Sequence, residues 1–180
     1  MEKTDEVLIQ NTLSGAIDSF DELMRRYERL VFKVAYSFGG SRENALDITQ
    51  TVFLKAFNNL STFRTDSGFK TWLLRITYNE GISWTRSPKN RADIHKDVED
   101  QVLLSQANQE SDLLDRERCQ MIHVGLNSLN GRYRTAILLR YVHDLPIREI
   151  AGVLQCSENM TKNILFRGVR NLRRTLVPPA

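Results

Sequence analysis

Apolar residues in the first third of the chain recur at steps of three and four, the spacing that lines one face of an α-helix. One run covers residues 20–38 and a second covers residues 45–60, with the breaking sequence Gly39-Gly40-Ser41 between them. Ser19 and Glu22 have the spacing of a capping box, so we expect the first helix to begin there. We expect the inner face of the second helix to carry Ala45, Ile48, Val52, Phe53, Ala56, Phe57 and Leu60.

A third periodic run covers residues 69–82 and follows a polar, flexible stretch at residues 61–68. Its apolar face includes Phe69 and Trp72, and we assign both to the core. The periodicity then fails, and residues 87–114 are rich in Asp, Glu, Asn and Gln. This composition is typical of a flexible linker.

A later segment has the layout of a helix-turn-helix. Pro146 stands where a helix over residues 147–154 would begin, a place where its missing amide does no harm. Residues 155–157 would form the turn, and Ser157 would cap a second helix over residues 158–176. A motif of this kind places its second helix in the major groove of DNA.

Helical periodicity also covers residues 113–129 and 136–141, and no alternating run is long enough to argue for a strand. The sequence therefore predicts an all-α protein of two small helical domains. These would comprise residues 1–86 and residues 115–180, joined by a flexible acidic linker at residues 87–114.

The second helix of the helix-turn-helix carries polar, amide and cationic groups beside apolar residues that we expect to face inward: Met160, Ile164, Leu165, Val169 and Leu172. Side chains near the start of such a helix reach base edges, and cations further along bind phosphates. The base-reading candidates are therefore Glu158, Asn159, Thr161, Lys162 and Asn163. Phe166 lies at the outer margin, and the phosphate-binding candidates are Arg167, Arg170, Arg173 and Arg174.

The distribution of charge along the chain supports this picture. The 180 residues are 41% hydrophobic and carry a net charge of only +3. However, the net charge is +1 over residues 1–90, −4 over residues 91–120 and +6 over residues 121–180. A basic C-terminal piece is expected of a protein that binds the phosphate backbone, whereas an acidic middle would repel nucleic acid or imitate it.

Several function classes find no support in the sequence. No stretch reaches the roughly 20 apolar residues of a membrane helix and no signal peptide precedes the first helix, so we expect a cytoplasmic protein without membrane insertion. We expect both cysteines, Cys119 and Cys156, to be reduced. Cys119 and His123 have no second ligand pair, and His95 and His143 have no catalytic partner, so we predict no metal site, no cofactor and no enzyme activity.

Three separated segments together resemble the extracytoplasmic-function (ECF) sigma factors, small bacterial initiation factors that give RNA polymerase its promoter specificity. The segments are DITQTVFLKAF at residues 47–57, FKTWLLRITYN at residues 69–79, and Glu149-Ile150-Ala151 with the helix that follows. The resemblance covers residues 19–176 and keeps the family's order of parts: a promoter-melting domain, a linker and a helix-turn-helix domain.

The resemblance implies partners for particular faces of the protein. Members dock on the beta-prime clamp helices and the beta flap of core RNA polymerase, and the clamp-binding positions here are Asp47, Gln50, Thr51, Leu54 and Lys55. Members capture the non-template strand of the minus-ten promoter element with the loop at residues 61–68 and the next helix. The corresponding residues here are Phe63, Arg64, Lys70, Arg75, Tyr78 and Asn79, which offer aromatic faces, amides and cations to unstacked bases.

The same resemblance assigns the minus-thirty-five promoter element to the helix-turn-helix. Members often have an Arg where this chain has Ile164, so we expect an uncommon sequence preference and one phosphate contact fewer. The acidic linker falls on the family's path towards the RNA exit channel, where it would either imitate RNA or act as an ordinary solvated linker. Members are usually held inactive by a cognate anti-sigma factor, which we expect here too.

Two other functions remain open from the residues alone. A stand-alone transcriptional regulator would use only the helix-turn-helix, with the first domain serving oligomerisation or sensing. It would bind specific duplex DNA without polymerase. An enzyme is the third hypothesis, but nothing in the sequence supplies a nucleophile together with its base.

Overall fold

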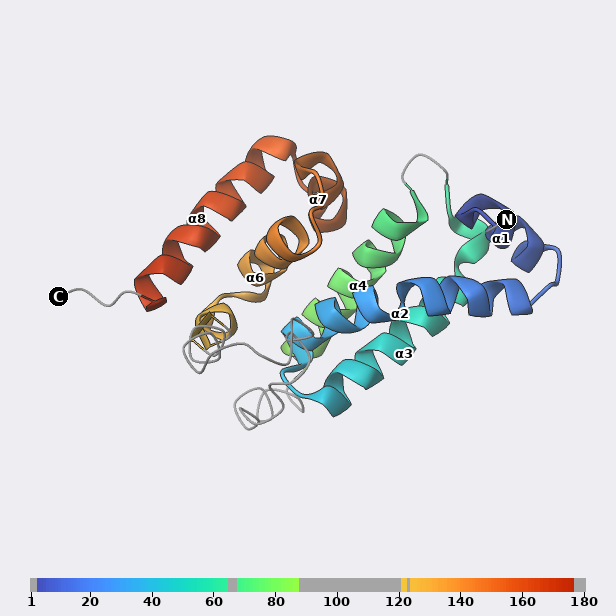
Figure 1. Ribbon diagram of the computed structural model, residues 1–180, viewed down its shortest axis with the longest axis horizontal. Helices are drawn as coiled ribbons and strands as arrows, with labels where there is room; N and C mark the ends of the chain where they lie inside the picture. Colours follow the sequence, from blue (N-terminus) through green and yellow to red (C-terminus); the bar gives the residue numbers. More distant parts are fainter. Residues whose placement is uncertain (1–2, 65–67, 88–120, 123, 177–180) are drawn as a thin grey trace, which may run out of the picture.

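The computed structural model describes residues 3–64, 68–87, 121–122 and 124–176, and these residues form helices and turns without a strand. The first domain is built from the helices at the blue to green end of Figure 1. They are α1 (Asp5–Leu13), α2 (Asp18–Gly39), α3 (Arg42–Asn58), the short 3₁₀ helix η1 (Leu60–Thr62) and α4 (Phe69–Arg86).

The second domain begins with helical turns at residues 124–128. It continues with α6 (Gly131–Ile137), the π-helical turn η3 (Leu138–Val142), α7 (Ile147–Leu154) and α8 (Glu158–Leu176). The prediction of an all-α fold with two helical domains is therefore confirmed. The predicted linker lies almost entirely outside the described residues.

The start of the first domain differs from the sequence prediction. Helix α2 begins at Asp18 rather than after Ser19, and its N-cap residue Ile17 makes no side-chain capping bond. Ser19 is buried in the first turn, so the capping box predicted with Glu22 is wrong. Helix α1 was not predicted, because its apolar residues give only a weak one-sided pattern.

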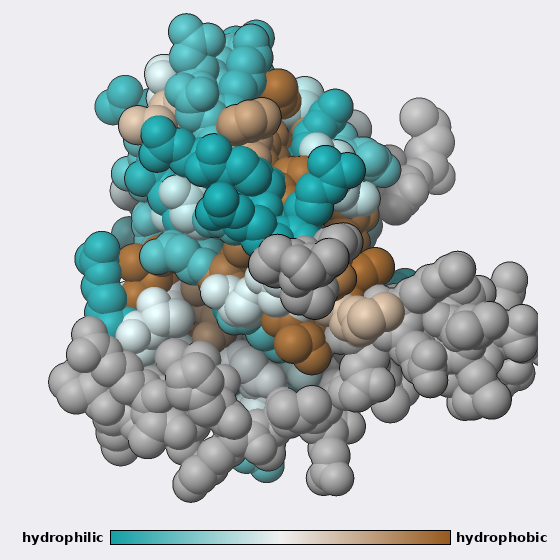
Figure 2. Space-filling model, turned by 90° about the vertical axis from the view of Figure 1, so that its left-hand side faces the viewer, coloured by the Kyte–Doolittle hydropathy of each residue, from teal (hydrophilic) through white to brown (hydrophobic). Residues whose placement is uncertain are grey.

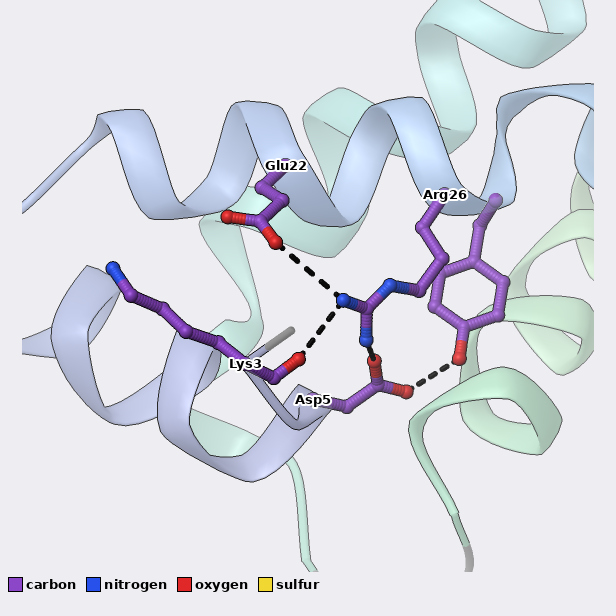
Figure 3. A network of polar contacts seen from close by, with 5 residues as sticks. Lys3, Asp5, Glu22 and Arg26 are labelled. Atoms are coloured by element: carbon purple, nitrogen blue, oxygen red, sulfur yellow. Dashed lines mark hydrogen bonds and ion pairs between the residues drawn. The ribbon is translucent and has the colours of Figure 1, made fainter. Parts of the chain in front are cut away.

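Polar contacts hold α1 on α2, as Figure 3 shows. The Asp5 carboxylate of α1 accepts hydrogen bonds from Arg26 at 2.5 Å and from the Tyr27 hydroxyl. Arg26 also donates to the backbone oxygen of Lys3 at 2.9 Å and lies 3.5 Å from the Glu22 carboxylate. Burial and the Asp5 carboxylate both raise the pKa of Tyr27, so the phenol stays protonated and keeps donating.

The predicted break after α2 is confirmed. Gly40 has a φ of 74°, the left-handed conformation that ends many helices and that glycine adopts without steric cost. Ser41 then caps α3 by accepting a hydrogen bond from the Asn44 amide at 3.2 Å. The Asn44 side chain returns a hydrogen bond of 2.9 Å to the Gly39 carbonyl, which fixes the angle between the two helices.

Helices α2, α3 and α4 pack on one another around the core of the first domain. The predicted inner residues of α2 are buried or half-buried, and those of α3 are buried with one exception. Phe57 is 40% exposed and packs edge-on against Phe20 at the rim, with ring centroids 5.1 Å apart. Phe69 and Trp72 are buried as predicted.

The helix-turn-helix forms where the sequence predicted it. Pro146 is the N-cap of α7, and Gln155 ends that helix in the left-handed conformation with a φ of 52°. Ser157 then accepts a hydrogen bond from the Met160 amide at 3.2 Å, which satisfies a free amide at the start of α8. Ala151 is buried at the crossing of α7 with its neighbours, where a small side chain allows close approach.

The two domains pack against each other, which the sequence did not predict. Helix α7 lies on α4, and α6 lies against α2. One cluster of buried apolar side chains runs through both domains, from Leu23 and Leu74 in the first to Leu139 and Ile150 in the second. The DNA-facing elements of the resemblance are therefore held side by side in this structure, as the placement of α4, α6 and α7 in Figure 1 shows.

Candidate nucleic-acid interface

The outer face of α8 is polar and cationic. Eight of the predicted polar side chains are exposed on this helix: Glu158, Asn159, Lys162, Asn163, Arg167, Arg170, Arg173 and Arg174. Phe166 is 68% exposed, and the Arg170 guanidinium carbon lies 6.0 Å from the centre of its ring, a cation–π distance. Figure 2 faces this side of the molecule and shows hydrophilic residues spread over most of its upper part.

The residues of α8 that pack inward are not all those that the sequence predicted. Thr161 is fully buried, and its hydroxyl donates a hydrogen bond of 3.1 Å to the Ser157 carbonyl. Thr161 therefore does not face a DNA partner, and its assignment as a base reader is wrong. Met160 and Val169, which were expected inside, are 49% and 41% exposed. The face that packs inward instead comprises Thr161, Ile164, Leu165 and Gly168.

Ile164, where the sequence departs from the pattern of the family it resembles, is buried. Its side chain is 5% exposed and belongs to the core shared by both domains. The residue therefore contributes apolar packing at a position where the ECF sigma factors that the sequence resembles often have an arginine. No exposed position of α8 is lost by the change.

The predicted polymerase-binding residues lie on the surface of α3. Asp47, Gln50 and Leu54 are exposed, and the Thr51 hydroxyl donates to the Asp47 carbonyl at 2.9 Å. Leu54 is 65% exposed, and Leu46 and Phe57 of the same helix are 38% and 40% exposed, so α3 presents apolar as well as polar side chains to solvent. Polar groups around exposed apolar side chains are the composition of a protein docking surface.

Lys55 differs from its neighbours because it has a partner within the chain. Its ammonium group forms an ion pair with the Glu80 carboxylate of α4, across the junction of the two helices. This pair stands at the edge of an open polar pocket of about 410 Å³ between α3 and α4. The pocket walls include Lys55, Asn59, Trp72, Arg75, Asn79 and Glu80.

The pocket brings together two residues predicted to bind the minus-ten element, Arg75 and Asn79, which lie one turn apart on α4. Both are exposed, and Trp72, which is only 7% exposed, also lines the pocket. A cation, an amide and an aromatic surface around a space of this size suit a nucleotide base. The sequence prediction did not include Asn59 or Glu80.

The loop before α4 is described on both sides of residues 65–67. Arg64 is exposed, whereas the ring of Phe63 packs on Phe69 and Trp72 with centroids 5.8 and 5.4 Å apart. Phe63 is half-buried in this aromatic cluster. Phe63 is therefore still partly accessible to solvent. Its packing on Phe69 and Trp72 holds the first part of the loop against the start of α4.

Lys70 and Tyr78 lie on a different face of α4 from the pocket. The Tyr78 ring packs on Phe38 with centroids 6.0 Å apart, and burial raises the pKa of its hydroxyl. Lys70 and Lys33 are close enough to His143 of the second domain to lower the pKa of that imidazole. Lys70 and Tyr78 are both half-buried.

The remaining sequence predictions concern metal ions, a membrane helix, and cysteine and histidine residues. Among the described residues, no group of three or more His, Cys, Asp or Glu is arranged to hold a metal ion. No helix in the described part of the chain is long and apolar enough to cross a membrane. Cys119, His123 and His95 lie outside the described residues.

Comparison with known proteins identifies the family. Residues 23–91 match Sigma-70 region 2, and residues 119–172 match Sigma-70 region 4. The ECF RNA polymerase sigma-E factor of Escherichia coli K12 is 30% identical over 91% of this chain and 90% of that protein. The chain belongs to the ECF sigma factors. The resemblance to ECF sigma factors that was predicted from three sequence segments is therefore confirmed.

Further relatives agree with this assignment, and a solved structure has the same fold. The sigma factor SigW of Bacillus subtilis is 27% identical over 98% of both chains, and the sigma-H factor of Pseudomonas aeruginosa is 28% identical over 98% of this chain and 96% of that one. The fold matches CnrH, solved with the cytosolic domain of CnrY, with a TM-score of 0.69, 22% identity and 96% coverage of both chains.

As an ECF sigma factor, the protein directs bacterial RNA polymerase to promoters and takes part in transcription initiation. Its partners are core RNA polymerase and promoter DNA. Family membership also decides between the functions that the residues alone left open, because a stand-alone regulator would not require both sigma regions in one chain.

Proposed function

We propose that this sigma factor divides its contacts among three surfaces. The exposed face of α3 binds the polymerase clamp, the pocket between α3 and α4 with Arg64 binds the melted minus-ten strand, and α8 reads the minus-thirty-five element. The observation that carries the proposal is the outer face of α8, where cations and amides are exposed directly after a well-formed helix-turn-helix turn.

Within α8, position along the helix separates two roles. Glu158, Asn159, Lys162 and Asn163 occupy the first turns, which enter the major groove in this class of motif. Arg167 and Arg170 come later and suit phosphates, with Arg170 held against the Phe166 ring. The first group sets sequence preference and the second group mostly sets affinity.

The pocket between α3 and α4 supports a role in melting. An unstacked base loses its stacking energy, so a protein that keeps it out of the duplex must offer other contacts. Arg75 and Asn79 can provide a charge-assisted and an amide hydrogen bond, and Trp72 provides an apolar edge. The pair of Lys55 with Glu80 ties the two walls of the pocket together.

An anti-sigma factor is the regulator that we propose for this protein. The sigma factor RpoE of Bartonella quintana, solved with the anti-sigma factor NepR, has the same fold with a TM-score of 0.67 and 22% identity. The exposed face of α3 around Leu54 is the surface we expect such a regulator to cover, because covering it would block polymerase binding. We place the protein in the cytoplasm with its polymerase, as an initiation factor rather than an enzyme.

Transcription in a purified system tests the proposal. Core polymerase with the protein should initiate from a cognate promoter found in a genomic library, and Leu54→Asp should weaken polymerase binding at least tenfold. Leu13→Asp, at an exposed leucine of α1, is the matched control and should bind normally. Normal polymerase binding by Leu54→Asp would overturn the assignment of the exposed face of α3 to the polymerase clamp.

A further inference from the structure

Among the described residues, Glu80 supplies the only carboxylate of the pocket between α3 and α4. It stands there with two cations, Lys55 and Arg75, and with the amides of Asn59 and Asn79. The Glu80 side chain is 15% exposed, compared with 51% for that of Lys55, so the carboxylate belongs to the wall of the pocket. A carboxylate repels the phosphates of DNA, so its place in this pocket requires a different group as its partner.

The ion pair with Lys55 leaves half of this carboxylate available. The Lys55 ammonium donates to the Oε2 atom of Glu80. In the part of the chain that the structure describes, no donor is bonded to the other oxygen, Oε1. An ionised carboxylate only accepts hydrogen bonds. The pocket therefore presents one free acceptor to a ligand at this point.

DNA has few groups that can donate to such an oxygen. The phosphate oxygens only accept, and DNA lacks the 2′-hydroxyl of RNA, so within a strand the donors are the N–H groups of the bases. Adenine, cytosine and guanine each carry an exocyclic amine, whereas thymine carries the O4 acceptor and a methyl group instead. A carboxylate that meets a base therefore favours a base with an amine and disfavours thymine.

The free oxygen and Arg75 together fit cytosine better than the other amino-bearing bases. The Watson–Crick edge of cytosine has the N4 amine beside two acceptors, N3 and O2. Oε1 of Glu80 can accept from the amine, and the planar guanidinium of Arg75 can donate to both acceptors. Guanine presents two adjacent donors, which require both carboxylate oxygens, and Lys55 occupies one of these. Adenine offers a single acceptor beside its amine, so it forms fewer bonds.

We propose that Glu80 is a specificity-determining residue, which selects cytosine at one position of the melted minus-ten strand and rejects thymine there. Lys55 is its positioning residue, because it binds the carboxylate from α3 and leaves one oxygen free. The inference rests on the proposed function, which brings the melted strand to this pocket. It adds the base that the pocket accepts and the residue that decides between bases.

Selection of bases by the holoenzyme tests the proposal. The probe is a fork DNA whose upstream duplex comes from a promoter active in purified transcription and whose non-template overhang is randomised over the minus-ten element. Sequencing of the bound DNA should show cytosine at one position, favoured over thymine by about fivefold or more. Glu80→Gln should accept thymine there within about twofold of cytosine, because its amide donates to O4. Glu28→Gln, at an exposed glutamate of α2, is the matched control and should keep the wild-type preference.

A modified base separates a direct contact from an effect on the fold. At the selected position, cytosine is replaced with 2-pyrimidinone, which lacks the N4 amine but keeps N3 and O2. The wild-type holoenzyme should bind this probe about fivefold more weakly or worse, whereas Glu80→Ala should bind both probes equally well. An equal loss in the two proteins would overturn the proposal, because the amine would then contact another group.

Replacing Lys55 tests its positioning role. Lys55→Met frees the second carboxylate oxygen, so guanine can donate to both. The ratio of guanine to cytosine at the selected position should rise by about threefold or more. This ratio compares two bases bound by one protein, so a change in overall affinity or in polymerase binding does not alter it. An unchanged ratio would overturn the positioning role of Lys55.

A further variant distinguishes failure of this inference from failure of the proposed function. Arg75→Ala with Asn79→Ala should weaken binding of the fork DNA by about tenfold or more, whatever base is present. Normal binding by this variant would remove the pocket from the minus-ten site and overturn the proposed function. If binding is lost but both Glu80 variants keep the wild-type preference, only the role of Glu80 is overturned. Selection of a base other than cytosine at the position that depends on Glu80 would overturn the assignment of cytosine.

Discussion

The Arg134 guanidinium and the Ser37 carbonyl, 97 residues apart in the chain, meet in a hydrogen bond that joins the two sigma domains. Arg134 also donates to the carbonyls of Leu126, Asn127 and Leu129, and each of these four acceptors is a backbone oxygen. Burial lowers the pKa of Arg134 to about 10, which still leaves it fully charged near neutral pH. The cation therefore acts as a permanent cap for helix ends on both sides of the junction.

Replacing Arg134 should destabilise the folded protein substantially. Arg134→Met leaves several buried carbonyl groups without a donor, and we expect the free energy of unfolding in urea to fall by about 2–4 kcal/mol. Arg134→Lys keeps the charge but cannot reach carbonyls in several directions, so its loss should be intermediate. Arg148→Lys, at an exposed arginine, should change stability by less than about 0.5 kcal/mol. Equal stability of Arg134→Lys and the wild type would show that the several donors of the planar guanidinium group are not needed.

Gly81→Ala should destabilise the protein although alanine favours helices. The new Cβ atom would lie 2.2 Å from the Phe38 ring, and overpacking of this kind costs about 1–3 kcal/mol. Gly152→Ala, at an exposed helical position with room for a methyl group, should stabilise by up to about 1 kcal/mol. Thermal unfolding followed by circular dichroism would measure both changes.

The clash can be tested by removing its partner. In the double variant Phe38→Leu with Gly81→Ala, the smaller side chain leaves room for the methyl group. We expect the double variant to be more stable than the sum of the two single changes allows, by about 1 kcal/mol or more. Additive effects would show that the alanine acts at some other contact.

Stability should depend on pH through His143. Burial, and then Lys33 and Lys70 from the first domain, lower the pKa of this imidazole to about 4, and Asp144 opposes the shift. The unfolded chain, with an ordinary pKa of 6.5, binds the proton more readily, so stability is full above pH 6.5 and falls as the pH drops towards 4.

The measurement compares urea unfolding of the wild type and His143→Gln between pH 7.5 and pH 5. The wild type should lose more stability over this range than the variant, because only the wild type gains a third cation beside Lys33 and Lys70. Partial exposure of the imidazole and 0.15 M salt will reduce the difference. Parallel pH profiles for the two proteins would show that other groups cause the change.

Lys162→Ala should weaken promoter binding by the holoenzyme. The side chain is exposed near the start of α8, and the loss should be about 1–3 kcal/mol if it contacts a base and smaller if it contacts a phosphate. Salt titration distinguishes the two, because losing a phosphate contact lowers the salt slope by about one. Arg148→Ala on α7 is the control for charge, and unchanged affinity of Lys162→Ala would remove this residue from the reading surface.

Local chemistry made much of the fold predictable. The positive φ of Gly40 and the capping hydroxyls of Ser41 and Ser157 act within a few residues, so helix ends follow from short stretches of sequence. The same reasoning failed at Ser19, because α1 packs over the start of α2 and buries that hydroxyl. A cap signature is a local preference, and tertiary packing can override it.

The sequence predicted which helix faces would form the candidate site, but it did not predict how those faces lie relative to one another. Polar spacing indicated most of the outer residues of α3, α4 and α8, but it misassigned Thr161 because one helical turn does not determine which margin is covered. The pocket joining Asn59 and Glu80 with Arg75 depends on how α3 and α4 cross.

The sequence by itself determined the helices, the helix-turn-helix and the family, since these depend on periodicity, turn residues and segments that can be compared along the chain. Only the tertiary structure decided that Thr71 meets Glu149, 78 residues away, and that Arg134 caps α2. The second buried face of α4, with Leu74 and Gly81, follows from that packing. Contacts of this kind depend on the complementary shapes of surfaces formed only after the helices exist, and no local pattern encodes which surfaces will meet.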